Sequence, residues 1–201
     1  MIPELLSLIG IAAFAVSGAV VGVRRRLDLL GVVVVGLATG TGGGVLRDLA
    51  LNVSPPAAFT HWPTLAVAVG ASLGVFVLHG RLSRLRRLEL VFDAFGMGLF
   101  AATGASYALD RAAGPMAAVL IGTLTAVGGG VIRDVLVNEI PIVLRRELYA
   151  ISALAGAVLT VALVAATGSL PLSTVAGVIL AVGLRLISLW RGWHLPAPKN
   201  R

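Results

Sequence analysis

The most regular feature of the sequence is a series of long apolar segments separated by short polar ones. An α-helix needs about 17–25 mostly apolar residues to cross the roughly 30 Å of hydrocarbon in a bilayer. No polar stretch is long enough to form a separate soluble domain. The pattern predicts seven transmembrane helices, at about residues 5–23, 29–51, 62–78, 90–109, 115–137, 148–167 and 170–190.

The composition agrees with a membrane protein. Hydrophobic residues make up 58% of the 201 residues and charged residues only 12%, with a mean hydropathy of +0.99. A soluble domain carries about 25% charged residues, so these polar side chains are too few to cover a water-facing surface. We therefore expect an integral protein of the cell (inner) membrane, in contact with the lipid bilayer.

The net charge of +7 does not indicate nucleic-acid binding. The basic residues form short clusters between the apolar segments, where determinants of membrane topology occur, and no patch of basic and aromatic residues resembles a nucleic-acid surface. Nucleic acid is therefore not an expected partner. Cysteine is absent, which removes thiolate metal ligands and cysteine nucleophiles.

One motif occurs twice in the chain. The second copy follows the first at an offset of 86 residues. The same offset pairs Phe14 with Phe100 and Asn52 with Asn138. We interpret residues of about 4–80 and 90–167 as two repeats of three helices, followed by an extra helix at about 170–190. The two copies of the motif are Gly42-Gly43-Gly44-Val45-Leu46-Arg47-Asp48 and Gly128-Gly129-Gly130-Val131-Ile132-Arg133-Asp134.

The odd number of helices in each repeat predicts that the second repeat enters the membrane from the opposite side. Cytoplasmic loops carry an excess of Lys and Arg, so we expect the N-terminus outside and the C-terminus in the cytoplasm. The predicted fold class is an all-α membrane protein with an inverted 3+3 repeat plus a seventh helix. The basic residues behind this orientation follow the first, third, fifth and seventh segments: Arg24, Arg25, Arg26, Arg81, Arg84, Arg86, Arg87, Arg145, Arg146, Arg191, Lys199 and Arg201.

The glycine triplets are candidates for a transport pathway. Each glycine weakens a helix interior by about 0.5–1 kcal/mol relative to alanine, and transporters place discontinuous helices at corresponding positions of two repeats. We therefore expect both triplets to kink a pore-lining helix. Hydroxyl groups and carbonyl groups can replace part of the hydration shell of a monovalent cation, which makes Ser17, Thr39, Thr103 and Thr125 candidate pore-lining residues.

An ordinary explanation exists for each of these features. Glycines in membrane helices can simply allow close packing, and Ser and Thr hydroxyls often bond to a carbonyl group one turn back. Both alternatives stay open at this point.

The Arg-Asp pair of each motif is costly at membrane depth. Adjacent residues do not face each other on a helix, so we expect Arg47 to pair with Asp134 and Arg133 with Asp48, setting the field of the pore. A structural clamp without ion contact is the alternative. Asp93, near the start of its segment, is expected to act at a helix end near the membrane surface.

The doubled Gly-Gly-Gly-x-x-Arg-Asp motif, in the second helix of each inverted repeat, together with a seventh helix, resembles the prokaryotic trimeric intracellular cation (TRIC) channels. The resemblance covers essentially the whole chain. It implies a homotrimer with a pore in each protomer, lined by the second and fifth helices and passing K⁺ and other monovalent cations. Some bacterial members of that family are described as glycine transporters, so both a channel and a carrier stay open.

We therefore predict a monovalent cation channel for K⁺ that needs no cofactor beyond its permeant K⁺ or Na⁺. The alternative is a secondary transporter of a small zwitterion such as glycine. An enzyme is not expected, because no segment carries a His-Glu metal motif or a paired nucleophile and base. No catalytic or metal-ligating residue is predicted.

Overall fold

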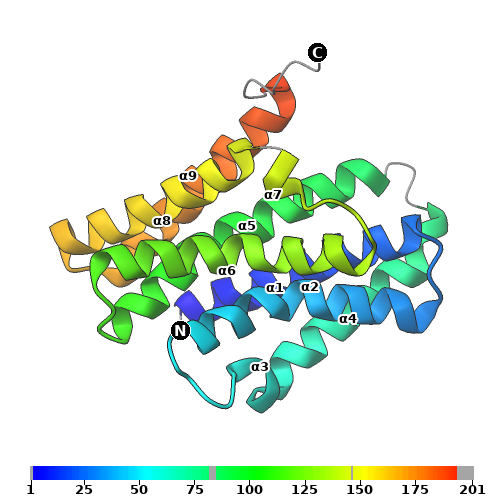
Figure 1. The fold of residues 1–201 in the computed structure, drawn as a ribbon, viewed down its shortest axis with the longest axis horizontal. Helices are drawn as coiled ribbons and strands as arrows, with labels where there is room; N and C mark the ends of the chain where they lie inside the picture. Colours follow the sequence, from blue (N-terminus) through cyan, green and yellow to red (C-terminus); the bar gives the residue numbers. More distant parts are fainter. Residues whose placement is uncertain (1, 82–84, 146, 194–201) are drawn as a thin grey trace.

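The computed structural model describes residues 2–81, 85–145 and 147–193, and the regular structure within them is helical (Figure 1). Arg84, Arg146, Lys199 and Arg201, four of the residues used to predict the topology, lie outside the described residues. In chain order the elements are α1 (Ile2–Arg24), α2 (Leu29–Ala50), α3 (Ala57–Thr60), α4 (Trp62–Leu78), a 3₁₀ turn (His79–Arg81), α5 (Leu85–Asp110), α6 (Pro115–Leu136), α7 (Ile142–Arg145), α8 (Glu147–Thr167) and α9 (Leu170–Arg191).

The long helices coincide with the predicted apolar segments. Within the described residues, the helices α1, α2, α5, α6, α8 and α9 are long and apolar enough to cross a membrane, and α4 is apolar but shorter. The largest difference is at α5, which begins at Leu85 rather than near residue 90 because exposed Arg86 and Arg87 extend its first turn beyond the apolar segment. The prediction of an all-helical, multi-pass membrane protein is confirmed.

Local signals in the sequence set several helix ends. The carboxylate of Asp28 accepts a hydrogen bond from the backbone N–H of Gly31 at 2.7 Å, which caps the start of α2. A proline lies in the first turn of α4, α6 and α9, where its missing N–H costs nothing. Asn52 and Asn138, which follow α2 and α6, have positive φ angles of 55° and 56°. Asparagine tolerates this left-handed conformation, so the chain turns at the same point of both repeats.

Helices α1 and α5 pack against each other through reciprocal contacts. A Cβ atom on Gly10 would lie 2.7 Å from the ring of Phe100, and one on Gly96 would lie 2.6 Å from the ring of Phe14. The two rings meet edge to face with centroids 5.2 Å apart. Because position 10 contacts position 100 while position 14 contacts position 96, the two helices run in opposite directions.

The same relation joins α2 and α6 at the glycine triplets. Gly43 lies against the carbonyl oxygen of Thr125, and Gly129 lies against the carbonyl oxygen of Thr39. These two helices therefore also cross in opposite directions. In Figure 1 the helices α1, α2, α5 and α6 occupy the middle of the molecule, with α8 and α9 side by side on one flank and α4 on the other.

The Phe14 ring should be a main support of this centre. Phe14 is completely buried, and replacing it with alanine leaves a cavity between α1 and α5. We expect Phe14→Ala to lower the free energy of unfolding by about 3 kcal/mol, measured by thermal unfolding of the protein in detergent micelles. The matched control is Phe59→Ala on α3, because Phe59 is 69% exposed. Equal losses for the two variants would contradict this view of the core.

Candidate functional site

The glycine triplets do not interrupt their helices. Both α2 and α6 are continuous α-helices across the triplets, so the expectation of discontinuous helices is not met in this structure. The backbone carbonyl groups that a break would release stay in the helical hydrogen-bond ladder. The triplets therefore do not supply free backbone carbonyl groups to an ion. Any contribution to the pathway comes from the absence of side chains at these positions.

That space is used for close packing between α2 and α6. A Cβ atom on Gly43 or Gly129 would overlap a backbone carbonyl oxygen of the facing helix. One on Gly128 would lie 2.6 Å from the side chain of Leu46, and one on Gly42 would lie 2.5 Å from that of Ile132. The packing explanation of the triplets is therefore supported by these contacts.

The candidate hydroxyl groups are buried around this crossing. Thr39, Thr103 and Thr125 are at most 3% exposed. Each donates its hydroxyl hydrogen to the carbonyl group four residues earlier, at 2.6 Å for Thr39 and Thr125 and 2.7 Å for Thr103. The oxygen lone pairs that these bonds leave can still accept from water or contact a cation. Gly18 lies against the Thr39 side chain and Gly104 against that of Thr125, so each threonine is packed from two helices.

Arg133 is the centre of the most buried charged group. The guanidinium Nη1 donates to Asp93 Oδ1 at 2.6 Å and to Ser17 Oγ at 2.8 Å, and Nε donates to Asp134 Oδ1 at 2.8 Å. All four side chains are at most 3% exposed as residues. One arginine of α6 thus holds α1 and α5 together, with two carboxylates around it. We call Ser17, Asp93, Arg133 and Asp134 the inner cluster.

Arg47, in the first copy of the motif, has different surroundings. Its Nε and Nη2 donate to Asp48 Oδ1 at 2.9 and 2.8 Å. Its guanidinium lies 3.7 Å from the ring centroid of Tyr107, and that of Arg111 lies 3.5 Å from the same centroid. The Arg47 side chain is 12% exposed, whereas that of Arg133 is fully buried. Arg47 therefore has one carboxylate and an aromatic ring instead of two carboxylates.

Two sequence differences between the repeats explain this contrast. At the offset of 86 residues, Asp93 corresponds to Ser7 and Tyr107 corresponds to Val21. Ser7 cannot supply the second negative charge that Asp93 gives to Arg133. Val21 offers no π-face, so only Arg47 can stack on an aromatic ring at this position.

The predicted pairing of Arg47 with Asp134 and of Arg133 with Asp48 is wrong. Each arginine instead pairs with the aspartate next to it in the sequence. Because α2 and α6 cross in opposite directions, their C-terminal ends point away from each other, and each Arg-Asp pair lies about 8 Å beyond the crossing. The long arginine side chain curls along its own helix to reach the adjacent carboxylate.

Both aspartates also hold the start of the next element. Asp48 Oδ2 accepts the backbone N–H of Ala57, and Asp134 Oδ2 accepts that of Ile142, each at 2.8 Å. One carboxylate oxygen thus faces the arginine and the other fixes the segment leading to α3 or α7. These bonds explain why the motif ends in aspartate, whose short side chain accepts hydrogen bonds on two sides.

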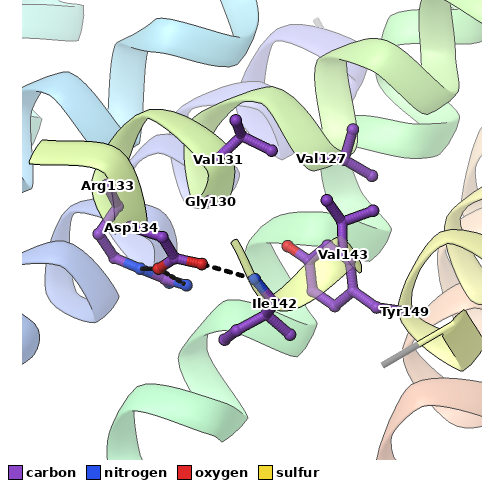
Figure 2. Close-up of a pocket in the computed structure, with 8 residues that line it drawn as sticks. All are labelled: Val127, Gly130, Val131, Arg133, Asp134, Ile142, Val143 and Tyr149. Atoms are coloured by element: carbon purple, nitrogen blue, oxygen red, sulfur yellow. Dashed lines mark hydrogen bonds and ion pairs between the residues drawn. The ribbon is translucent and has the colours of Figure 1, made fainter. Parts of the chain in front are cut away.

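Figure 2 shows a narrow crevice beside Arg133 and Asp134. Its empty volume is about 140 Å³, but it is too narrow to admit a water molecule. A Cβ atom on Gly130 would lie 3.1 Å from Tyr149 Oη, so this glycine keeps space beside the buried tyrosine. The corresponding Gly44 has no atom of another element within 4 Å of that position. The residues lining the crevice are Val127, Gly130, Val131, Arg133, Asp134, Ile142, Val143 and Tyr149.

The sequence analysis gave one residue of the charged groups the wrong role and missed three others. Asp93 lies beyond the first turn of α5, completely buried and bonded to Arg133, so its expected role at a helix end is wrong. Tyr107, Tyr149 and Arg185 were not singled out. A charge such as Arg185 inside an apolar segment is a recognisable signal of function in membrane proteins, whereas nothing in the sequence marks the two tyrosines.

Alanine at the two neighbouring glycines should have opposite effects. We expect Gly43→Ala to destabilise the protein, because its Cβ atom overlaps the Thr125 backbone and forces α2 away from α6. Gly44→Ala meets open space and should be neutral or stabilise the helix by about 0.5–1 kcal/mol. Thermal unfolding of both variants in the same detergent measures the difference. Equal behaviour of the two variants would refute backbone contact as the role of Gly43.

The two motif arginines should also differ in their contribution to stability. Arg133→Gln leaves Asp93 and Asp134 buried without their cation, which costs about 3–5 kcal/mol in folded proteins. Arg47→Gln removes the partner of one carboxylate at a partly exposed position, so we expect a smaller loss. Thermal unfolding and the yield of folded protein measure both effects. A larger loss for Arg47→Gln would contradict the unequal roles of the two copies.

A sequence model of the family described as "Glycine transporter" matches residues 4–80 and again 90–165. The UPF0126 inner membrane protein YadS of Escherichia coli K12 is 39% identical over 196 residues, covering 96% of this chain and 93% of that protein. A UPF0126 membrane protein of Deinococcus radiodurans is 45% identical over 154 residues, covering 76% of this chain and 72% of that protein.

Solved structures give the same result. The TRIC trimeric intracellular cation channel orthologue from Rhodobacter sphaeroides has a TM-score of 0.91 and 38% identity, covering 95% of this chain and 98% of that one. A structure described as explaining conductance through TRIC cation channels has a TM-score of 0.89 and 36% identity, covering 98% of both chains. These neighbours are channels, in agreement with the expectation that the chain is not an enzyme. The two sequence relatives are described as UPF0126 membrane proteins. The chain itself belongs to the prokaryotic TRIC channel family.

Proposed function

We propose that the protein is a monovalent cation channel that conducts mainly K⁺, with a pore in each protomer of a homotrimer. The observation that carries the proposal is the likeness, over 95% of this chain, to a structure described as a trimeric intracellular cation channel. The lipid bilayer and the permeant cations are its partners, and we expect no cofactor and no nucleic acid.

The proposed pore follows the crossing of α2 and α6. The buried hydroxyl groups of Thr39 and Thr125 lie on these two helices, and that of Thr103 lies on α5. Their free lone pairs suit a partly dehydrated monovalent cation. The two glycine triplets keep bulky side chains away from this crossing, and they are the places where α2 and α6 can bend when the pore opens. The Arg-Asp pairs lie beyond the crossing at either end and set the electrostatic field there.

The pore is proposed to lie between two inverted repeats, with α9 as the seventh membrane helix. The reversed directions of α1 and α5 and of α2 and α6 support this arrangement, as do the two separate stretches matched by the family model. The distribution of basic residues supports an N-terminus outside and a C-terminus in the cytoplasm. In that orientation the inner cluster faces the cytoplasm and the Arg47–Asp48 pair faces the outside.

A secondary transporter of glycine is the second candidate, because the matching family model is described as a glycine transporter. A zwitterion needs a site with separate partners for its carboxylate and its ammonium group. Some transporters hold such substrates between the ends of two half-helices, where a membrane helix is broken. Helices α2 and α6 are unbroken, so they offer no such ends. This observation favours the channel.

A planar-bilayer recording of the purified protein in asymmetric KCl tests the proposal. We expect unitary currents that reverse near the K⁺ equilibrium potential, because the pathway is lined by hydroxyl oxygens and its charges are nearly balanced. Glycine uptake into liposomes made from the same preparation is measured in parallel. Silence in the bilayer together with saturable glycine uptake would overturn the channel and support the carrier.

A pair of threonine variants provides the control. Thr39→Val removes a buried hydroxyl with little change of volume and should lower the unitary K⁺ conductance, since Thr39 lies at the crossing. Thr167→Val makes the same chemical change at the exposed end of α8 and should leave the conductance unchanged. Equal conductance in both variants would remove Thr39 from the pore.

A further inference from the structure

Tyr149 carries a buried hydroxyl group without a hydrogen-bond partner. The residue lies on α8 and is 2% exposed. Within residues 2–81, 85–145 and 147–193, neither Tyr149 Oη nor Asp93 Oδ2 forms a hydrogen bond. Buried polar groups in folded proteins are nearly always hydrogen-bonded, so each exception needs a physical explanation.

Both groups approach the same glycine. A Cβ atom on Gly130 would lie 3.1 Å from Tyr149 Oη and 3.7 Å from Asp93 Oδ1, the other oxygen of that carboxylate. Gly130 and Tyr149 also line the crevice of Figure 2, which shows the tyrosine hydroxyl directed into it. An unpaired donor therefore faces the crevice, and an unpaired acceptor belongs to a carboxylate close to it.

The width and the lining of the crevice keep water out. Its empty volume of about 140 Å³ is too narrow to admit a water molecule. Narrow apolar constrictions in channels close by excluding water. The tyrosine hydroxyl opposes this dry state, because a buried polar group that has lost its hydrogen bonds to water raises the free energy. The apolar side chains that line the crevice are Val127, Val131, Ile142 and Val143.

The position of the crevice suits a gate. It begins at Val127 and Gly130, within the part of α6 that carries the glycine triplet, and it reaches Arg133 and Asp134 of the inner cluster. Residues of α7 and α8 form its other side. In the orientation proposed above, this is the cytoplasmic end of the pathway. A small movement of α8 away from α6 would widen the crevice enough for water to reach the hydroxyl.

We infer that this crevice is a wetting gate at the cytoplasmic end of the pathway, with the Tyr149 hydroxyl as the group that binds the entering water. In the closed state the crevice is dry and blocks ions. In the conducting state water fills it and forms hydrogen bonds with Tyr149 Oη and Asp93 Oδ2. This inference rests on the proposed cation channel and identifies a residue that sets the balance between its two states.

Planar-bilayer recordings of four proteins test the inference: the wild type, Tyr149→Phe, Val143→Thr and Val158→Thr. Tyr149→Phe removes the water-binding hydroxyl, so we expect the open probability to fall about fivefold, the effect of one net hydrogen bond. Val143→Thr adds a hydroxyl to the crevice with little change of volume and should raise the open probability. Val158→Thr makes the same chemical change on α8 where Val158 is 46% exposed, and it should have no effect.

The two crevice variants have to move the open probability in opposite directions. An unchanged or higher open probability in Tyr149→Phe would overturn the wetting gate. The absence of a rise in Val143→Thr, or an equal rise in Val158→Thr, would overturn it as well.

The melting temperature separates a role of the hydroxyl in gating from a role in folding. Tyr149→Phe keeps the ring, whose centroid lies 4.8 Å from the Arg185 guanidinium, and removes a hydroxyl that forms no hydrogen bond with the described residues. We therefore expect the variant to melt at or above the temperature of the wild type in detergent. A lower melting temperature would show that the hydroxyl is hydrogen-bonded in the closed state, and it would overturn the inference.

Labelling of introduced thiols measures the entry of water without any current. The chain has no cysteine, so Val127→Cys places a single thiol in the lining of the crevice. A charged methanethiosulfonate reagent reacts with the thiolate, which forms where water reaches the sulfur. In liposomes we expect Val127→Cys to react and Val158→Cys to stay unlabelled. Adding Tyr149→Phe should slow the reaction of Val127→Cys about fivefold.

The labelling also distinguishes the gate from the channel. No reaction of Val127→Cys, or an equal rate with and without the Tyr149 hydroxyl, would overturn the wetting gate. A protein that is silent in the bilayer but shows the expected labelling would overturn the proposed channel alone, because the labelling reports the hydration of the crevice and not the current.

Discussion

The contact between the backbones of α2 and α6 is the constraint on which the other features depend. Helices in a bilayer gain little from burying apolar surface, because lipid is as apolar as leucine, so close packing has to supply much of their association. Gly43 and Gly129 permit this approach, since any side chain there would overlap a carbonyl oxygen. Once the two helices cross at this distance, the threonines are enclosed around the crossing and the two Arg-Asp pairs are directed to opposite ends.

The two copies of the motif show how identical residues acquire different roles from their neighbours. Arg133 is surrounded by two carboxylates and a serine on three helices, whereas Arg47 has one carboxylate and shares a tyrosine ring with Arg111. The difference arises from single positions on α1 and α5, not from the motif. A duplicated framework has therefore kept its packing while its two ends have become electrostatically unequal.

The helices and their approximate ends could be predicted because an apolar segment of membrane length has few alternatives to a helix. The importance of the doubled motif was also visible, since costly glycines and charges occurred twice in one register. The role of the glycines was harder to predict: a triplet that breaks a helix and a triplet that packs against another look the same in sequence. The partners of Arg47 and Arg133 depend on the direction in which α2 and α6 cross, and the partners Asp93 and Tyr107 lie on α5, which the motif does not identify.

The two hydrogen bonds of Asp134 have a mechanical consequence. One carboxylate oxygen is tied to the end of α6 through Arg133, and the other is tied to the first residue of α7. A rotation of the end of α6 would therefore pull on the connection to α8, and movement of α8 would be transmitted back to the glycine crossing. Asp48 forms the same linkage at the other end of the molecule. Each aspartate therefore couples the end of its helix to the segment that follows it, at opposite ends of the crossing.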